Sequence, residues 1–431
     1  MKVFKTPYLY LGIVLLFSAM NISWQGDRTA RRVLGSDAQG YYAYLPALFI
    51  YNDLSFGFAD SISTKYFTSD TKYGYSADLE KGVVNKYFAG TALLEAPFFL
   101  LAYSANQLGF GPVDGYAPAF PNLISISGIF YLLFGLWFFE RVCVKMGIQQ
   151  KTAWLFGVFL VFGTNLFHYT VVEPGMSHVY SFALINGFIY QTLQWRDSNR
   201  LRNLLGMGFL FGLIFLVRPV NIIIAFSLPF FFVPPNRFQA FFIQLFKNWK
   251  GLLLAGVIAL FVLSVQSLIY FFQTGDFWVY SYEGEGFNFG NPAFLDFLFS
   301  YKKGYFLYTP MAFLAVILGG YYLIKTDRPG FFYWSGFLIF LIYVLSSWWN
   351  WWYGGSFSSR VMIDFSIVLF FPFVKWLDKQ RKGVFRTTIL GVLFFLTMVC
   401  QIQTLQYRYF IIHWDSMNKE LYWEHFLELP G

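Results

Sequence analysis

Long apolar blocks alternate with short polar connections along almost the whole chain. Most blocks hold roughly 17 to 24 residues with few charges, the length that an α-helix needs to cross a hydrocarbon core about 30 Å thick. Eleven blocks follow this pattern: 7–24, 122–140, 152–170, 179–195, 203–217, 221–233, 251–272, 305–324, 331–347, 361–376 and 387–406. The pattern predicts an all-α, polytopic bundle of transmembrane helices. No small-residue cleavage site follows the first block, so we expect an uncleaved first helix.

Two further stretches leave the number of crossings open. Positions 87–107 are apolar enough to span, and positions 41–50 form a shorter apolar stretch. Pro46 interrupts the shorter stretch, and Glu95 and Pro97 lie inside the longer one, so we favour an interfacial or re-entrant position for the longer one. If the two stretches instead cross as a pair, the count rises from eleven to thirteen.

Basic residues are concentrated in every second connection between the predicted spans. Loops rich in Lys and Arg stay in the cytoplasm. The basic clusters are Arg141/Lys145/Lys151, Arg196/Arg200/Arg202, Arg237/Lys247/Lys250, Lys325/Arg328 and Lys375/Lys379/Arg381/Lys382/Arg386. The N-terminus, with Lys2 and Lys5, is then cytoplasmic, and the alternate connections and the tail at 407–431 are external.

The amino-acid composition argues against a soluble protein. Hydrophobic residues make up 57% of the 431 positions and charged residues 13%, about half the charged share of an average soluble domain. The net charge of +8 follows from the basic loops, so we expect no nucleic-acid partner. Cys143 and Cys400 lie far apart in apolar blocks and indicate neither a metal nor a redox motif.

Isolated charges at a membrane edge are costly, which makes them candidates for function. In the predicted topology they share the external face: Asp37, Lys86, Glu95, Glu173, His178, Arg218, Lys302, Lys303 and Arg360. The long polar segments 25–86, 273–303 and 407–431 lie there as well. We therefore expect any chemistry at this face.

This set of charges suits a reaction on a lipid-linked phosphate. Arg and Lys at helix ends can neutralise a phosphate at headgroup level, and an acceptor hydroxyl needs a carboxylate to take its proton. Asp37, soon after the first span, is the expected catalytic base. The expected phosphate ligands are Arg218, Arg360, Lys302 and Lys303.

Several motifs resemble those of the GT-C superfamily of polyprenyl-phosphate-sugar-dependent glycosyltransferases, which includes protein O-mannosyltransferases and aminoarabinose transferases. They are GSDAQGYY at 35–42, KYFAG and APF within 86–98, LVRP at 216–219, KGYFLYTP at 303–310 and WWYGGSFSSR at 351–360. The resemblance implies a single domain over 1–431, an external first loop at 25–121 with interfacial or re-entrant helices, and an external tail. It also implies inverting transfer of a hexosyl or pentosyl group to a hydroxyl of a lipid, glycan or protein, outside a bacterial inner (plasma) membrane.

The resemblance further implies which side chains contact the substrates: Tyr41, Tyr42, Lys86, Glu173, His178, Trp351 and Trp352. Two features depart from the family. Asp37 lacks the adjacent acidic residue that is common there, and no large soluble C-terminal domain follows the last span, which argues against transfer to Asn. The spacing of Asp37, Glu173 and His178 matches no metal signature, so we expect neither a metal nor a cofactor.

Structural roles are the alternatives for these residues. Asp37 could cap an interfacial helix, Arg218 could satisfy helix-end carbonyls, and Arg360 could pair with Asp364 one turn on. Residues 348–353 could form an interfacial aromatic belt, and Lys302 with Lys303 could anchor to lipid headgroups. Glu173 with His178 could only hydrogen-bond the turn.

Two other functions remain open for the whole chain. A multi-span transporter or lipid flippase would also place charges in a helix bundle, but it usually shows internal repeats and midplane polar sites, neither of which the sequence has. A non-catalytic assembly subunit would not need Asp37.

Overall fold

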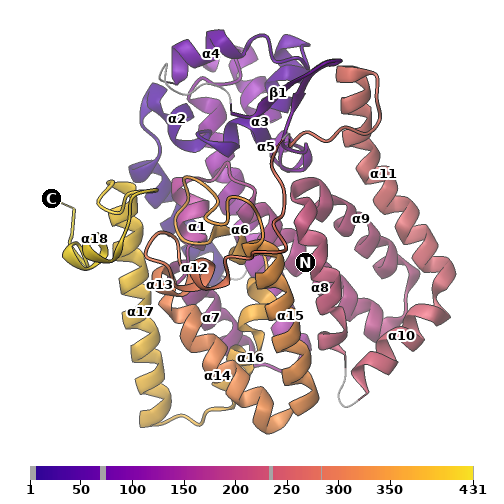
Figure 1. Ribbon diagram of the computed structural model, residues 1–431, viewed down its shortest axis with the longest axis vertical. Helices are drawn as coiled ribbons and strands as arrows, with labels where there is room; N and C mark the ends of the chain where they lie inside the picture. Colours follow the sequence, from indigo (N-terminus) through magenta and orange to yellow (C-terminus); the bar gives the residue numbers. More distant parts are fainter. Residues whose placement is uncertain (1–5, 68–73, 233–235, 283, 431) are drawn as a thin grey trace.

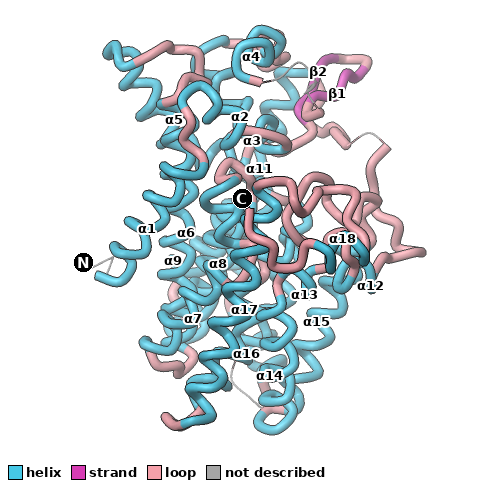
Figure 2. Tube along the Cα trace, turned by 90° about the vertical axis from the view of Figure 1, so that its left-hand side faces the viewer, coloured by secondary structure: helices cyan, strands magenta, loops and turns pink. Residues whose placement is uncertain are grey.

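A computed structural model of the chain describes residues 6–67, 74–232, 236–282 and 284–430. These residues are mostly helical, as Figures 1 and 2 show, so the predicted all-α class is confirmed. The α-helices are α1 (Thr6–Ile22), α2 (Thr29–Val33), α3 (Asp37–Pro46), α4 (Ala59–Tyr66), α5 (Gly90–Ala105), α6 (Ala119–Lys145), α7 (Gln150–Phe162), α8 (His178–Ser198), α9 (Leu201–Val217), α10 (Arg237–Lys247), α11 (Trp249–Thr274), α12 (Phe294–Phe299), α13 (Tyr305–Tyr308), α14 (Pro310–Thr326), α15 (Arg328–Ser346), α16 (Ser366–Lys379), α17 (Val384–Arg408) and α18 (Lys419–Glu424). Short 3-10 or π-helical segments are η1 (Gly26–Arg28), η2 (Ala47–Tyr51), η3 (Asn106–Phe110), η4 (His168–Val172), η5 (Pro219–Phe231) and η6 (Arg360–Ile363). The strands β1 (Ser76–Leu79) and β2 (Gly82–Asn85) form an antiparallel hairpin.

The chain folds into a helical bundle with a layer of shorter elements over one end. Figure 1 shows α2 to α5 and the hairpin in the upper part, beside the upper end of α11 and above the other long helices. Residues of the predicted first loop, 25–121, supply this layer. Helix α5 joins the two parts, because it packs against α3 in the layer and against α6 and α9 in the bundle. We call the covered end of the bundle its layer end.

Small residues permit the close contact between α9 and α11. Gly208 and Gly212 lie one turn apart on α9 and face Ala255 and Ala259 on α11. A Cβ at Gly208 would lie 2.2 Å from the carbonyl oxygen of Ala255, so a larger side chain would force the helices apart. Small residues spaced four apart are typical of helices that pack closely in lipid. The sequence thus explains why these helices form one of the most extensive contacts in the bundle.

Helices α6 and α8 run side by side in the same direction, away from the layer end. Near their starts, the hydroxyl oxygens of Ser127 and Tyr180 lie 2.6 Å apart. Near their ends, Lys145 Nζ lies 2.7 Å from Asp197 Oδ2. Helix α7, which lies between α6 and α8 in the sequence, therefore runs back toward the layer end.

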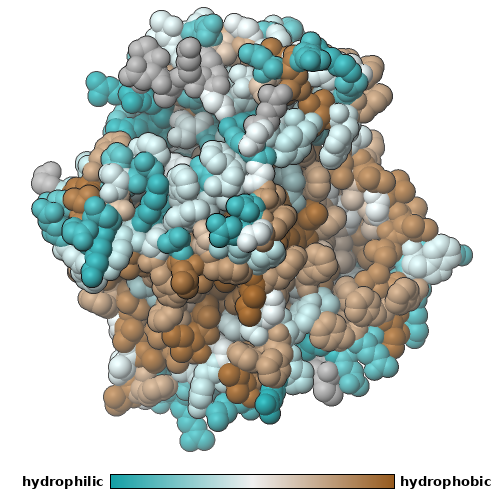
Figure 3. Space-filling model, viewed as in Figure 1, coloured by the Kyte–Doolittle hydropathy of each residue, from teal (hydrophilic) through white to brown (hydrophobic). Residues whose placement is uncertain are grey.

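Four α-helices of the described ranges are long and apolar enough to cross a membrane, namely α6, α11, α15 and α17. A fifth candidate combines α1 with Gly26–Val33 across a bend of 107°. Helices α7, α9, η5 and α14 are apolar but shorter. Figure 3 shows hydrophobic residues over the long helices, with hydrophilic residues above them and at the lower edge. The chain is an integral membrane protein.

Each predicted span coincides with a helical segment, but several spans are divided. The predicted span 152–170 stops at the end of α7, Phe162, and helical structure resumes at His168. The predicted span 305–324 is divided at Pro310, which starts α14 because a first-turn residue needs no N–H donor. Helix length alone supports four or five crossings, and the number eleven or thirteen stays a prediction.

Orientation across the membrane can be tested with two matched cysteine variants. Ser416 follows α17, whose last turn contacts the layer-end terminus of α1, and Ser198 ends α8 at the opposite end of the bundle. Both side chains are exposed, whereas Cys143 and Cys400 are buried and contribute little background labelling. If the layer end is external, a membrane-impermeant thiol reagent labels Ser416→Cys in intact cells and Ser198→Cys only after permeabilisation. The reverse pattern would overturn the predicted orientation.

Candidate functional site

Asp37 and Arg360, 323 positions apart in the chain, form an ion pair at the layer end. The Nη2 atom of Arg360 lies 2.5 Å from Oδ2 of Asp37. Asp37 begins α3, and Arg360 begins η6. The Asp37 side chain is 26% exposed and that of Arg360 is 8% exposed, so the carboxylate stays accessible while the guanidinium is buried.

Strained backbone precedes both members of this pair. Ser36 has φ 54° and ψ −135°, and Ser358 has φ 59°, values that residues with a side chain rarely adopt. Such conformations cost on the order of 1–3 kcal/mol each and concentrate at functional sites. The strain therefore marks both segments as candidates for function.

Asp37 is held in its ionised form. Burial by itself favours the neutral carboxyl, but the Arg360 guanidinium and the Tyr87 hydroxyl outweigh it, so the pKa of Asp37 lies below its usual range. Lys86 adds to this effect, although its own ammonium group lies 3.5 Å from a carboxylate oxygen of Glu285. A carboxylate with a lowered pKa is a weak base while its cationic partner remains bound.

A second carboxylate, that of Asp364, is completely buried and has three polar partners. His178 Nδ1 lies 3.0 Å from Oδ1, and the Asn221 side-chain amide donates to Oδ2 at 2.7 Å. Arg218 Nε lies 3.4 Å from the same Oδ2 atom. These partners come from the start of α8, from η5 and from the junction of α9 with η5. Asp364 thus fixes the position of Arg218, because a buried carboxylate is stable only with compensating donors.

The turn between η4 and α8 joins the two ion pairs. Arg218 Nη1 donates to the Ser177 hydroxyl at 3.4 Å, and the same hydroxyl bonds with Tyr41. One residue earlier, Met176 Sδ lies 3.9 Å from Arg360 Nη1. The residues predicted from separate loops therefore belong to one cluster.

Lys303 adds a third cation to this cluster. Its side chain is buried, its ammonium group donates to the carbonyl oxygen of Ser356, and Nζ lies 5.1 Å from the centre of the Tyr407 ring. Among the described residues, no carboxylate oxygen lies within 4.0 Å of it. Burial and the nearby Arg360 charge lower the pKa of Lys303 to about 7. An anion from outside the chain that binds beside Lys303 would raise its pKa again and favour the ammonium form.

Glu173 faces His168 rather than His178. The distance from His168 Nε2 to the carboxylate is 3.4 Å. Burial raises the pKa of Glu173, but His168 and then Arg360 outweigh it, and the pKa lies below its usual range. Within the described ranges, no three His, Cys, Asp or Glu side chains are placed to share a metal ion, and Asp37, Glu173 and His178 form no such group.

The pKa of Lys303 predicts a pH-dependent stability. Between pH 7 and about 10 the unfolded chain keeps this proton and the folded chain has lost it, so stability rises with pH in that window. We expect the thermal midpoint in detergent to increase from pH 7 to pH 9 more in the wild type than in Lys303→Met. The neighbouring Lys302→Met variant is the control and should keep the increase. Equal pH profiles for wild type and Lys303→Met would contradict the buried position of this ammonium group.

Four predicted site residues lie apart from the ion-pair cluster. Lys302 pairs with Asp415 at 2.7 Å and lies 4.1 Å from the centre of the Trp352 ring. Trp351 packs against Trp352 with ring centres 5.6 Å apart. Tyr42 is fully buried, and its hydroxyl donates to a backbone carbonyl. The donor-phosphate contact predicted for Lys302 and the substrate contacts predicted for Tyr42, Trp351 and Trp352 stay predictions.

The structural alternatives for three residues are not what the structure shows. No side-chain capping hydrogen bond forms at the start of α3, where Asp37 lies. Among the described residues, the Arg218 guanidinium contacts the side chains of Ser177 and Asp364 and not helix-end carbonyls. Arg360 pairs with Asp37 and not with Asp364, so the alternative in which Arg360 pairs with Asp364 one turn on does not hold.

Asp364, Asn221 and Tyr87 are members of the site that the sequence did not predict. Asp364 lies inside the predicted span 361–376, and Asn221 begins the predicted span 221–233. The rule that ionisable residues inside spans are functional candidates would have found Asp364. Tyr87 carries no such signal, because an aromatic residue near a membrane edge is common.

No protein-family model and no curated protein matches the chain. Among solved structures, it aligns with archaeal oligosaccharyltransferase AglB from Archaeoglobus fulgidus, solved in complex with an inhibitory peptide and a dolichol-phosphate. The TM-score is 0.50 at 10% sequence identity, and AglB is a GT-C glycosyltransferase. This chain has a GT-C fold. The alignment covers 98% of this chain and 60% of that one.

The apo form of an oligosaccharyltransferase from the same organism aligns with a TM-score of 0.48, also at 10% identity and over the same shares of both chains. The resemblance to the GT-C superfamily that the motifs indicated is confirmed at the level of the fold. The chain spans about three fifths of the length of AglB.

Proposed function

We propose that this chain is a membrane glycosyltransferase that moves a sugar from a polyprenyl-phosphate donor to an acceptor hydroxyl on the non-cytoplasmic face, with inversion. The observation that carries the proposal is the cluster of Arg218, Arg360 and Lys303 beside an accessible Asp37. Cations at one membrane edge complement a lipid-linked phosphate. AglB, which shares the fold, has been solved with a dolichol-phosphate, itself a polyprenyl phosphate.

The reaction would be a single displacement. Asp37 takes the proton of the acceptor hydroxyl, and the hydroxyl oxygen forms a bond to the anomeric carbon on the face opposite the phosphate. The bond from that carbon to the phosphate oxygen breaks, and the polyprenyl phosphate leaves with the bonding electrons. Arg360, Arg218 and Lys303 stabilise the developing negative charge.

The ion pair between Asp37 and Arg360 links donor binding to base strength. In the free protein, Arg360 holds the pKa of Asp37 low, which makes Asp37 a weak base. A donor phosphate competes for the Arg360 guanidinium, since two anions then share one cation. The pKa of Asp37 returns toward its usual range only when the donor is in place, and the base becomes active beside its substrate.

A comparison of cells with and without the protein tests the function and the acceptor class together. We expect a glycolipid or a glycoprotein to lose one sugar in cells that lack the protein. Wild-type protein should restore it, and so should Asp27→Asn, which changes an exposed acid of the same segment. Asp37→Asn should not restore it. Unchanged glycan profiles in cells without the protein would contradict the proposal.

A further inference from the structure

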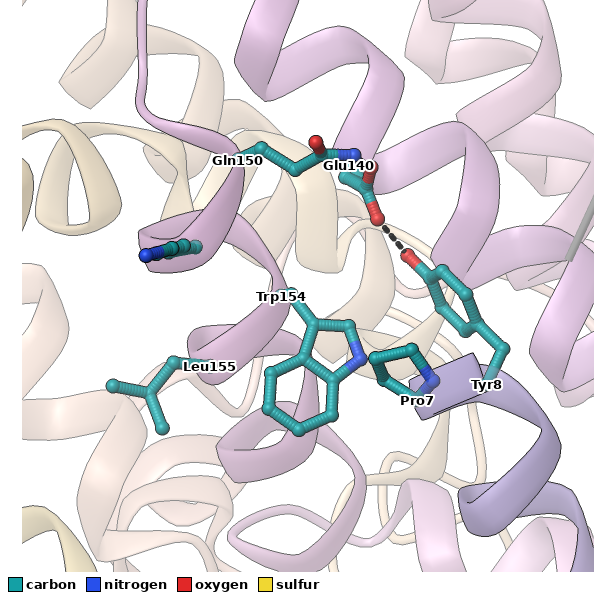
Figure 4. A pocket seen from close by; sticks show the side chains of 7 residues that line it. Pro7, Tyr8, Glu140, Gln150, Trp154 and Leu155 are labelled. Atoms are coloured by element: carbon teal, nitrogen blue, oxygen red, sulfur yellow. Dashed lines mark hydrogen bonds between the residues drawn. The ribbon is translucent and has the colours of Figure 1, made fainter. Parts of the chain in front are cut away.

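An apolar groove lies between α1 and α7. It has a volume of about 400 Å³, and among the residues that line it are Pro7, Tyr10, Val14, Trp154, Val158 and Phe162. Figure 4 shows the end of the groove that is farthest from the layer end, where the Trp154 ring lies beside Pro7. Both helices run from there toward the layer end, so Val14 and Phe162 mark the end of the groove that is nearer to it.

The face of α1 that lines the groove continues toward the layer end. Tyr10, Val14 and Phe17 follow one another at spacings of four and three, so they share one face of the helix. Their side chains are between 51% and 64% exposed. At the end of α1, the carbonyl oxygen of Ile22 accepts a hydrogen bond from Arg408 Nη2 at 3.1 Å. At 1.5 Å per residue, Ile22 lies about 12 Å beyond Val14.

Helix α17 connects the groove to Arg408 by a second route. The side-chain amide of Gln401 donates to the carbonyl oxygen of Phe162 at 2.6 Å, at the end of the groove nearer to the layer end. Gln401, Leu405 and Arg408 follow at spacings of four and three, which puts them on one face of α17. Leu405 is exposed, so an apolar side chain lies on the way. Arg408 lies about 10 Å beyond Gln401 along this helix, which agrees with the route along α1.

Arg408 belongs to a basic patch at the layer end, made of Arg31, Arg32 and Arg408. Arg32 on α2 is close enough to Arg408 and to Arg31 for their positive charges to repel one another. Arg31 is exposed, and Arg32 and Arg408 are half-buried. Asp27 and Arg28, just before α2, carry opposite charges and leave the excess of positive charge in place. In the predicted orientation the patch is external, where the positive-inside rule does not account for it. A bound anion would relieve the repulsion.

We propose that the basic patch and the groove together bind one anionic phospholipid. Its phosphate pairs with Arg32 and Arg408, since guanidinium groups bind phosphate through paired N–H donors. One acyl chain passes Phe17 and Leu405 and enters the groove beside Phe162. Half of a hydrocarbon core is about 15 Å thick, so a chain that starts at the patch reaches the groove within one leaflet. The patch repels a headgroup ammonium, so an anionic headgroup binds better than a zwitterionic one. This proposal does not depend on the proposed function.

Native mass spectrometry of the delipidated full chain tests this proposal with dioleoyl phosphatidylglycerol and dioleoyl phosphatidylcholine, which share their acyl chains. We expect the first phosphatidylglycerol to bind with a dissociation constant at least tenfold lower than that of phosphatidylcholine. Arg32→Gln should remove most of that preference. Arg200→Gln, at an exposed arginine of the opposite end of the bundle, should keep it. Equal binding of the two lipids by the wild type, or an unchanged preference in Arg32→Gln, would overturn the proposal.

A second variant tests the apolar part and covers the case in which Arg32→Gln fails to fold. Val14→Trp fills the groove from an exposed position and leaves the arginines in place. We expect it to weaken phosphatidylglycerol binding at least tenfold with an unchanged gel-filtration profile. Undiminished binding would place the acyl chain elsewhere and overturn the proposal. Displacement of the bound phosphatidylglycerol by an equal concentration of polyprenyl phosphate would assign the site to the donor lipid and would likewise contradict the proposal.

Discussion

The Asp37→Asn variant is expected to transfer sugar about 10²–10⁴ times more slowly than the wild type, because it loses the base that takes the acceptor proton. Asparagine keeps the size of aspartate and can still accept a hydrogen bond from Arg360, so the variant should fold. The KM for the donor should not rise, since Arg360 loses only the competing negative charge of its intramolecular partner. A fall in kcat without a rise in KM indicates an interaction realised in the transition state. Steady-state kinetics with purified protein measure both quantities.

The same variant separates catalysis from a purely structural role. If Asp37 only neutralises Arg360, Asp37→Asn lowers the thermal midpoint and leaves the kcat of the folded fraction near the wild-type value. Asp27→Asn is the control for a lost acidic charge at an exposed position of the same segment. An Asp37→Asn protein with wild-type kcat would exclude the proposed base and would leave Glu173 as the next candidate.

Removal of either arginine is expected to weaken use of the donor by about 10- to 100-fold. A hydrogen bond to a charged group contributes about 1.5–3 kcal/mol, and about 1.4 kcal/mol corresponds to a tenfold change. Arg360→Ala also removes the partner of Asp37 but leaves the base itself in place. The kcat/KM for the donor should therefore fall more than the kcat/KM for the acceptor. The kcat/KM of Arg360→Lys for the donor should lie between that of the wild type and that of Arg360→Ala, because lysine keeps the charge but not the planar pair of donors.

An exposed arginine outside the site provides the control for the two arginine variants. Arg28→Ala removes an exposed guanidinium from η1 and should leave donor kinetics unchanged. Wild-type kcat/KM in Arg218→Ala together with a lowered thermal midpoint would return Arg218 to a structural role as the partner of Asp364. The same outcome in Arg360→Ala would remove the central cation from the proposed phosphate site.

Much of the fold could be predicted from hydrophobic periodicity. Each predicted span coincides with a helical segment, because apolar side chains must face lipid or the bundle core whatever their partners are. The divisions inside spans could not be predicted, since they depend on tertiary contacts. The break between Phe162 and His168 is one example: there the side-chain amide of Asn165 donates to the Phe357 carbonyl at 3.2 Å, a contact with a segment far along the chain.

The sequence predicted several residues of the site but not which of them form ion pairs. Isolated charges identified Asp37, Arg218, Lys303 and Arg360, and these residues lie in one cluster. Which acid pairs with which base depends on how distant loops fold together, and the sequence carries no such information. Spacing by one helical turn made Asp364 an alternative partner for Arg360, but the backbone after Arg360 is a 3-10 segment, which turns the two side chains differently.

Sugar transfer by the purified full chain tests the proposed reaction itself. The protein is reconstituted with a polyprenyl-phosphate sugar that carries a radiolabel in the sugar and with an acceptor extract from cells that lack the protein. We expect one labelled product and one free polyprenyl phosphate for each sugar transferred, both lost in Asp37→Asn and both kept in Asp27→Asn. Label that stays on the donor with every acceptor fraction would contradict it, as would transfer at an equal rate by Asp37→Asn.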